Sequence, residues 1–220
     1  MNRKKICIIG AQGVGKTTIC NGVIINLMQK LVNNYQLDGG ISYSLESCCN
    51  NINKYYNLAL IPEQFREVVK DIPNFKNQTE EITLTTYAKQ LYLENLYTAQ
   101  GKNILCDRSV LDTLVYYDYF NKQEFGDVCE GYFVADLNYS DSVLLVAKRH
   151  IEIYSKIYLI EPSDRPIEDD GFRLTDKKQQ LEVHNLFLEY FRNFDNVEIV
   201  NQEDAHKEEF INKVVNEFVL

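Results

Sequence analysis

Residues 10–18, with the sequence GAQGVGKTT, could bind phosphate groups. They fit the pattern GxxxxGK[ST] between an apolar segment and a helical pattern, and that context disfavours a chance glycine-rich turn with a surface lysine. The glycines let the backbone aim several N–H groups at phosphate oxygens, and the following helix adds its positive N-terminal end. The expected phosphate-binding residues are Gly10, Gln12, Gly13, Val14, Gly15, Lys16, Thr17 and Thr18.

Two side chains of this loop have more specific expected roles. Lys16 should reach the β- and γ-phosphates of a nucleoside triphosphate, and Thr17 should place its hydroxyl on Mg²⁺. Thr18 could donate to a phosphate oxygen or only support the start of the helix. The sequence does not decide between these two roles for Thr18.

Asp107 and Arg108 form a second candidate element, at the end of the apolar segment NILC. Ligands of doubly wound sheets bind at the carboxyl ends of the strands, so both side chains should face the phosphates. Asp107 could hold Mg²⁺ directly or through water, and Arg108 could neutralise charge on a transferring phosphoryl group. The alternative is a surface ion pair that follows a strand.

Glu63 begins a third element, because it follows an apolar segment that ends at Pro62. A carboxylate at the carboxyl end of a strand could accept a proton from a hydroxyl acceptor. Arg66 lies one helical turn further along the chain. Alternatively, Glu63 is an acidic residue at a helix start that interacts with the helix dipole, and Arg66 is a solvated charge.

The polar stretch EPSDRPIEDDGFRLTDKK, residues 161–178, stands between a strand pattern and a helix pattern. It could close over a bound triphosphate and deliver Arg165 or Arg173 to it. Charged loops are usually only solvated, so the pattern leaves both interpretations open.

Five short apolar segments are expected to form the strands that position these residues: 4–10, 57–62, 103–107, 156–161 and 196–200. Most of them lack alternation, as expected of strands that are buried on both faces. The clearest helical pattern follows the glycine motif and consists of Ile19, Val23, Leu27 and Leu31. Further helices are expected at 82–100, 109–120, 140–154, 176–193 and 204–218. Strands that alternate with helices imply an α/β fold with a parallel sheet.

The composition of the 220 residues, with 45% hydrophobic and 25% charged residues, is that of a globular protein. The apolar runs are far shorter than the roughly 20 residues that a membrane span needs, and the start of the chain does not resemble a secretory signal. We therefore expect a single domain over 1–220, located in the cytoplasm. The six cysteines lack CxxC spacing, which argues against a Cys/His metal site.

The net charge of −9 argues against general binding to nucleic acid. Residues 1–37 contain five basic and no acidic residues, so the rest of the chain holds 18 basic and 32 acidic residues. Binding to nucleic acid would need a local basic track, and the sequence shows none.

The chain resembles the nucleoside and nucleotide kinase branch of P-loop proteins, and most closely the NadR-like AAA domain family, which includes ribosylnicotinamide kinase domains. The segments that carry the resemblance are, in order, GAQGVGKTT, IPEQFREVV, ILCDRSVLDTLVYY and YLIEPSDRPIEDDGFR. The resemblance implies a three-layer P-loop NTPase fold, in which helices cover both faces of a parallel five-stranded sheet of order 2-3-1-4-5. It also implies a lid at 162–178 and is compatible with a small insertion at 121–139.

The same resemblance implies roles for several residues. Glu63 corresponds to the acidic residue that follows the second strand of deoxynucleoside kinases, near the phosphoryl acceptor. Asp107 and Arg108 resemble the DR pair of thymidylate kinases, and Arg165 and Arg173 resemble lid arginines.

We thus expect a Mg²⁺-dependent kinase that transfers a phosphoryl group from ATP or GTP to a small nucleoside-like or nucleotide acceptor. The expected catalytic residues are Lys16, Glu63, Asp107, Arg108 and Arg173, with Arg165 at the donor and with Thr17 and Asp107 at the metal. A regulatory nucleotide switch without a small acceptor is an alternative, and its partner surface could be 121–139. A kinase that acts on modified bases in DNA is a less favoured alternative. The sequence also leaves a homodimer open.

Overall fold

The strands lie within one residue of the segments expected from the sequence. The computed structural model describes residues 3–35, 44–70, 80–125, 149–167 and 175–219. The strands in these ranges are β1 (Lys5–Gly10), β2 (Leu58–Ile61), β3 (Asn103–Asp107), β4 (Lys156–Glu161) and β5 (Val197–Asn201). All neighbouring pairs are parallel, and the order β2-β3-β1-β4-β5 confirms the expected sheet.

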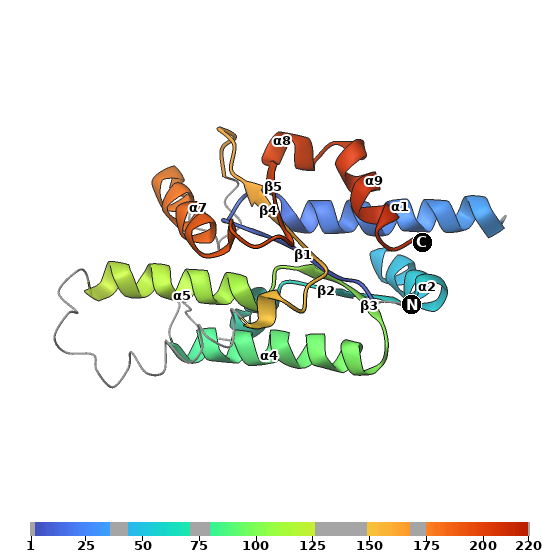
Figure 1. Ribbon diagram of the computed structural model, residues 1–220, viewed down its shortest axis with the longest axis horizontal. Coiled ribbons are helices and arrows are strands. Elements are labelled where there is room, and N and C mark those ends of the chain that lie inside the picture. The colour runs from blue at the N-terminus through green and yellow to red at the C-terminus, as the bar shows by residue number, and fades with distance from the viewer. Residues whose placement is uncertain (1–2, 36–43, 71–79, 126–148, 168–174, 220) are drawn as a thin grey trace.

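Helices cover both faces of this sheet (Figure 1). The described helices are α1 (Lys16–Tyr35), α2 (Leu45–Tyr56), α3 (Gln64–Val69), α4 (Glu80–Ala99), α5 (Val110–Phe125), α7 (Lys177–Phe191), α8 (Gln202–Ala205) and α9 (Glu208–Asn216). The core on one face lies beneath α1, α2, α8 and α9, and the core on the other face lies beneath α4, α5 and α7. None of the described helices is both long and apolar enough to span a membrane.

The central strand β1 explains why the strand sequences do not alternate. Ile6 and Ile8 pack into the core beneath α1, whereas Cys7 and Ile9 pack into the core beneath α5. All six residues of β1 are buried, because helices cover both of its faces. The sheet therefore holds the glycine motif, which follows β1 directly, at the centre of its carboxyl edge.

Two helices differ from the sequence expectation. The helix expected at 204–218 is divided into α8 and α9, because Lys207 adopts an extended conformation with ψ 149° and caps a new helix. Helix α2, whose buried residues are Cys48 and Ile52, was not expected from the sequence. Ser44 caps the start of α2 by accepting a hydrogen bond from the Ser47 amide. Cys48 is thus a core residue.

Several expected segments lie wholly or partly outside the described residues. Within the helix expected at 140–154, residues 149–151 are described as helical and 140–148 are not described. Within the expected insertion at 121–139, residues 121–125 belong to α5 and the remainder is not described. The lid at 162–178 is described except for 168–174, a range that includes Arg173.

Candidate functional site

The glycine motif forms a tight loop between β1 and α1. Gly10, Gly13 and Gly15 have φ values of 140°, 77° and 82°, in the region that residues with side chains rarely adopt. A Cβ atom on Gly10 would lie 2.7 Å from the Ile160 carbonyl oxygen of the neighbouring strand. Glycine is therefore required at these positions by backbone conformation and, at Gly10, by close packing.

Lys16 lies at the first turn of α1 and is buried. Its ammonium group folds back over the loop and donates to the carbonyl oxygens of Gly10 (2.7 Å) and Ala11 (2.6 Å). Burial, together with the nearby Arg108 charge, lowers the pKa of Lys16 to about 7. Negative groups in the loop would restore the ordinary pKa, so this lysine is suited to an anionic ligand.

Thr17 and Asp107 meet next to Lys16. Ile8 of β1 is paired with Asp107 of β3, and this places the end of β3 beside the loop. The Thr17 hydroxyl donates to Asp107 Oδ2 at 2.6 Å, while the buried Oδ1 has no hydrogen-bond partner among the described residues. Burial raises the pKa of Asp107, although the hydrogen bond from Thr17 opposes this shift.

These two residues offer the oxygen ligands that Mg²⁺ prefers. In the described ranges, no group of three or more His, Cys, Asp or Glu side chains could hold a metal ion. Mg²⁺ characteristically keeps several water molecules and binds through one or two protein groups and the phosphates of a substrate. The unpartnered Asp107 Oδ1 beside the Thr17 hydroxyl fits such a partial ligand set.

Arg108 has an unusual backbone, with φ of 74°, which is uncommon and costly for a residue with a side chain. Its Nε lies 2.6 Å from Glu63 Oε1, and its Nη1 lies 3.5 Å from Asp112 Oδ1. Burial opposes the charge, but Glu63, Tyr116 and Asp112 outweigh burial and raise the pKa of Arg108. Arg108 therefore keeps its positive charge in a partly buried position beside the loop.

Glu63 lies between two arginines, at the carboxyl end of β2. Its Oε2 is 3.1 Å from Arg66 Nε, and its Oε1 contacts Arg108. Glu63 occupies the residue before α3, but its side chain makes no capping hydrogen bond with that helix. The helix-start interpretation thus explains the position of Glu63 in the chain, and the ion pair with Arg108 explains where its side chain lies.

Asp112 and Tyr116 of α5 also lie at Arg108, and neither was among the site residues expected from the sequence. Asp112 Oδ2 accepts a hydrogen bond from the Ser109 amide at 2.9 Å, and the Ser109 hydroxyl accepts one from the Leu111 amide. This arrangement at a helix start is a capping box. The pattern SxxD after a strand could have revealed this helix start. Burial raises the pKa of Asp112 to about 6, although Arg108 and Lys16 oppose the shift.

Tyr116 connects α5 to the glycine loop. Its hydroxyl donates to Gln12 Oε1 at 2.8 Å, and its ring centroid lies 5.4 Å from the Arg108 guanidinium carbon. Burial raises the pKa of Tyr116 to about 12, so its hydroxyl stays protonated. No local sequence pattern could have found this contact, which joins residues 104 positions apart.

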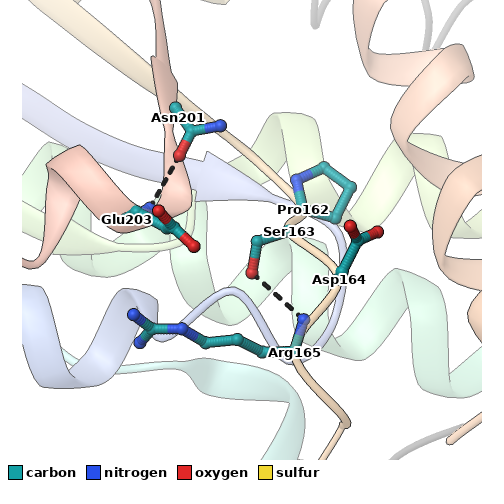
Figure 2. A pocket seen from close by; sticks show the side chains of 6 residues that line it. All are labelled: Pro162, Ser163, Asp164, Arg165, Asn201 and Glu203. Atoms are coloured by element: carbon teal, nitrogen blue, oxygen red, sulfur yellow. Dashed lines mark hydrogen bonds between the residues drawn. The ribbon is translucent and has the colours of Figure 1, made fainter.

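Arg165 lies in a different part of the site, on an open pocket at the carboxyl ends of β4 and β5. The pocket has a volume of about 580 Å³ and is lined by Pro162, Ser163, Asp164, Arg165, Asn201 and Glu203. Figure 2 shows Ser163 near its centre and the exposed Arg165 side chain extending away from Asp164. Thr18 is exposed at the first turn of α1. Arg173 lies outside the described residues.

The family profile described as an AAA domain matches residues 47–208, which is more than half of the chain and begins after the glycine loop. A comparison with curated proteins finds no match.

Two solved structures share the fold. Thymidylate kinase from Ehrlichia chaffeensis has a TM-score of 0.52 and 16% identity, with 100% of this chain and 98% of that chain covered. Deoxyadenosine kinase from M. mycoides, with bound dATP, has a TM-score of 0.53 and 16% identity, with 98% and 100% covered. The fold is thus that of P-loop nucleoside and nucleotide kinases, as expected. The closer resemblance to the NadR-like family stays a prediction.

Proposed function

The chain belongs to the AAA domain family, and from this membership and the site geometry we propose that it is a Mg²⁺-dependent phosphotransferase. It would move the terminal phosphoryl group of ATP or GTP to a small nucleoside-like or nucleotide acceptor. One observation carries the proposal: an ion pair of Glu63 with Arg108 lies beside the Lys16 loop. A protein that only binds a triphosphate has no need of this carboxylate, whereas a hydroxyl acceptor needs a base within reach.

The donor triphosphate would bind to the loop amides and to Lys16. The pKa of Lys16 is lowered to about 7. Bound phosphates would raise this pKa, so the amine would take up a proton and attract the phosphates as a cation. The pocket lined in part by Ser163, Arg165 and Glu203 would take the sugar and base. We keep Arg165 and Arg173 as proposed lid arginines that approach the phosphates.

Thr17 and Asp107 would hold Mg²⁺, through the hydroxyl and the unpartnered carboxylate oxygen. When bound, this ion neutralises charge on the phosphates. The protein side chains that do the same are the buried Lys16 and the partly buried Arg108, which both act in surroundings less polar than water.

The acceptor hydroxyl would lie against Glu63. As the oxygen of the acceptor hydroxyl forms a bond to the terminal phosphorus, the bond between that phosphorus and the bridging oxygen of the donor breaks. The hydroxyl proton passes to the Glu63 carboxylate and then to solvent, while the diphosphate stays on the loop. Arg66 and Arg108 hold the two oxygens of Glu63 in place, so the carboxylate is positioned before the acceptor arrives.

The test is a panel of nucleosides and nucleotides incubated with labelled ATP or GTP, in which phosphoryl transfer and bare hydrolysis are measured separately. We expect transfer to at least one small acceptor, and Lys16→Ala serves as the control for contaminating kinases. Hydrolysis without transfer to any acceptor would contradict the proposal and favour the regulatory switch. Transfer only to bases within DNA would favour the DNA kinase.

A further inference from the structure

Three consecutive carbonyl groups of the glycine loop are contacted by polar side chains from the C-terminal part of the chain. Gln180 Nε2 of α7 donates to the carbonyl of Gln12 at 2.5 Å. Gln202 Nε2 of α8 donates to the carbonyl of Gly13 at 3.1 Å. His206 Nε2, directly after α8, lies 3.2 Å from the carbonyl of Val14. Each contact joins residues more than 160 positions apart.

The orientation of the two glutamine side chains follows from their other partners. Gln202 Oε1 accepts from the amide of Ser163 at 2.9 Å, so its nitrogen must face Gly13. Gln180 Oε1 accepts from Lys177 Nζ at 3.1 Å, so its nitrogen must face Gln12.

A backbone carbonyl can only accept, so the contact with Val14 requires that His206 Nε2 carries a proton. All three side chains therefore act as donors to the loop.

Fixing a carbonyl also fixes the amide of the next residue. In a trans peptide unit the C=O of one residue and the N–H of the next point in opposite directions. Holding the carbonyls of Gln12, Gly13 and Val14 toward α7 and α8 therefore turns the N–H groups of Gly13, Val14 and Gly15 toward the other side. The phosphates are expected on that other side, because these are the amides of the phosphate-binding pattern.

The contact of Gln180 is buried, and those of Gln202 and His206 are partly buried. Gln180 is 1% exposed and Gln202 is 5% exposed. A Cβ atom on Gly13 would lie 2.9 Å from the Ile167 side chain, and one on Gly15 would collide with the His206 ring. Because a loop of glycines has little conformational preference of its own, these neighbours supply the order that its sequence does not.

We propose that Gln180, Gln202 and His206 are positioning residues, which hold the loop amides in the orientation that binds the phosphates of the donor. This inference rests on the proposed function, because it assigns these residues to the donor side of the same site. They would not touch the reacting atoms. Their effect would be to reduce the ordering that the loop must undergo when the triphosphate binds.

The test measures the Kd of ATP and of tripolyphosphate by calorimetry in the absence of acceptor. Gln180→Leu and Gln202→Leu each remove one donor at nearly constant volume. We expect each variant to lower the affinity for ATP and for tripolyphosphate by the same factor of about tenfold, since a net hydrogen bond is worth roughly 1.4 kcal/mol. Gln179→Leu, on the same helix as Gln180, is the matched control and should bind both ligands like the wild type.

His206 allows a test by rescue. His206→Leu should lower the affinity for both ligands as much as Gln180→Leu and Gln202→Leu do. His206→Gln keeps a side-chain donor and should recover most of the affinity. His206 is half-buried, so both variants are expected to fold, and melting temperatures measured without ligand check this.

The outcomes separate the inference from the proposed function. Wild-type affinity for both ligands in the folded leucine variants would overturn the positioning role and leave the proposed function intact. A loss confined to ATP would place the effect in the pocket, through Ser163, and would also overturn it. If the wild type binds neither triphosphate nor tripolyphosphate, the proposed function fails and this inference fails with it.

Discussion

Two groups of buried charged side chains lie at opposite ends of the sheet, and they differ in how completely their polar atoms are paired. At the amino ends of β1 and β4, the carboxylate of Glu94 accepts from Lys5 (2.6 Å), Gln90 (2.8 Å), His150 (3.0 Å) and Tyr154 (2.7 Å). At the carboxyl ends, Lys16 contacts only backbone carbonyls in the described part of the chain, and Asp107 Oδ1 has no partner there.

The pKa shifts follow the same division. Burial opposes ionisation of Glu94, yet His150, Lys5 and Gln90 outweigh it and lower the pKa of this carboxyl. Burial dominates at Lys16, Asp107 and Asp112, where the pKa of the amine is lowered and the pKa values of the two acids are raised. The first group is complete as folded, whereas polar atoms of the second lack partners in the described part of the chain, as the proposed function would require. Burial alone would not have distinguished these two clusters.

The largest expected effect is that of Lys16→Ala on the incomplete cluster. Phosphoryl transfer should fall by about 10³-fold, the upper scale for one preorganised electrostatic contact. Stability should not fall, because the variant removes an amine that burial disfavours as a cation. Transfer assays and thermal unfolding on the same samples provide the check. Wild-type turnover and triphosphate affinity in Lys16→Ala would show that the loop does not bind the donor.

Glu94→Gln should have the opposite profile. Removing the charge leaves the buried Lys5 without its counter-ion and should destabilise the fold by about 3–5 kcal/mol in chemical denaturation. Triphosphate affinity of the folded protein should stay near that of the wild type. Since folding lowers the pKa of Glu94 from 4.5, its stabilising contribution is present above that pH and is lost as the pH falls through the folded value. A variant equally stable as the wild type at neutral pH would contradict this view of the complete cluster.

Glu63→Gln tests the acceptor side of the incomplete cluster. The substitution keeps the size of the side chain and removes the base, so transfer should fall by about 10²-fold while donor affinity stays near the wild-type value. Glu67→Gln is the matched control, because Glu67 follows in the same helix and forms an exposed pair with Lys70. Transfer at the wild-type rate in Glu63→Gln would remove Glu63 from the reaction and move the acceptor site toward Arg66 and Tyr116.

Asp107→Asn tests the proposed metal site with a smaller expected effect. The amide keeps the shape of the side chain but lacks the charge that attracts a cation. The Mg²⁺ concentration for half-maximal transfer should rise by about tenfold, at the lower end of the effects of altered metal surroundings. A magnesium titration of the transfer rate measures this shift, and an unchanged midpoint would exclude Asp107 as a ligand.

The last expected effect is a dependence of donor affinity on pH. With a pKa of about 7, Lys16 is mostly neutral in the free protein above that pH, whereas bound phosphates would raise its pKa and keep it charged. Binding should therefore take up a proton, and affinity should fall by at most about tenfold per pH unit between roughly pH 7.5 and pH 9. Calorimetry in buffers of different ionisation enthalpy detects the proton, and Lys16→Ala should show no uptake.

The sequence determined the sheet, because each strand is a short apolar segment that both cores can bury. It also showed where the glycine loop lies, because Gly10, Gly13 and Gly15 permit the positive φ values that the loop adopts. It did not reveal α2, since Cys48 and Ile52 give too few buried positions for a clear helical pattern. The positions of Glu63, Asp107 and Arg108 at strand ends could be predicted from the sequence, and parallel strands bring such side chains to one edge of the sheet.

Only the tertiary structure decided which of these groups contact one another. The hydrogen bond between Thr17 and Asp107 spans 90 positions, and that between Gln202 and Gly13 spans 189. Such pairs leave no periodic or spaced pattern, because the contact depends on how helices pack over the sheet and not on neighbours along the chain. The pairing of buried charges is likewise a property of the packed fold, since it is burial that shifts the pKa values of Lys16 and Asp112.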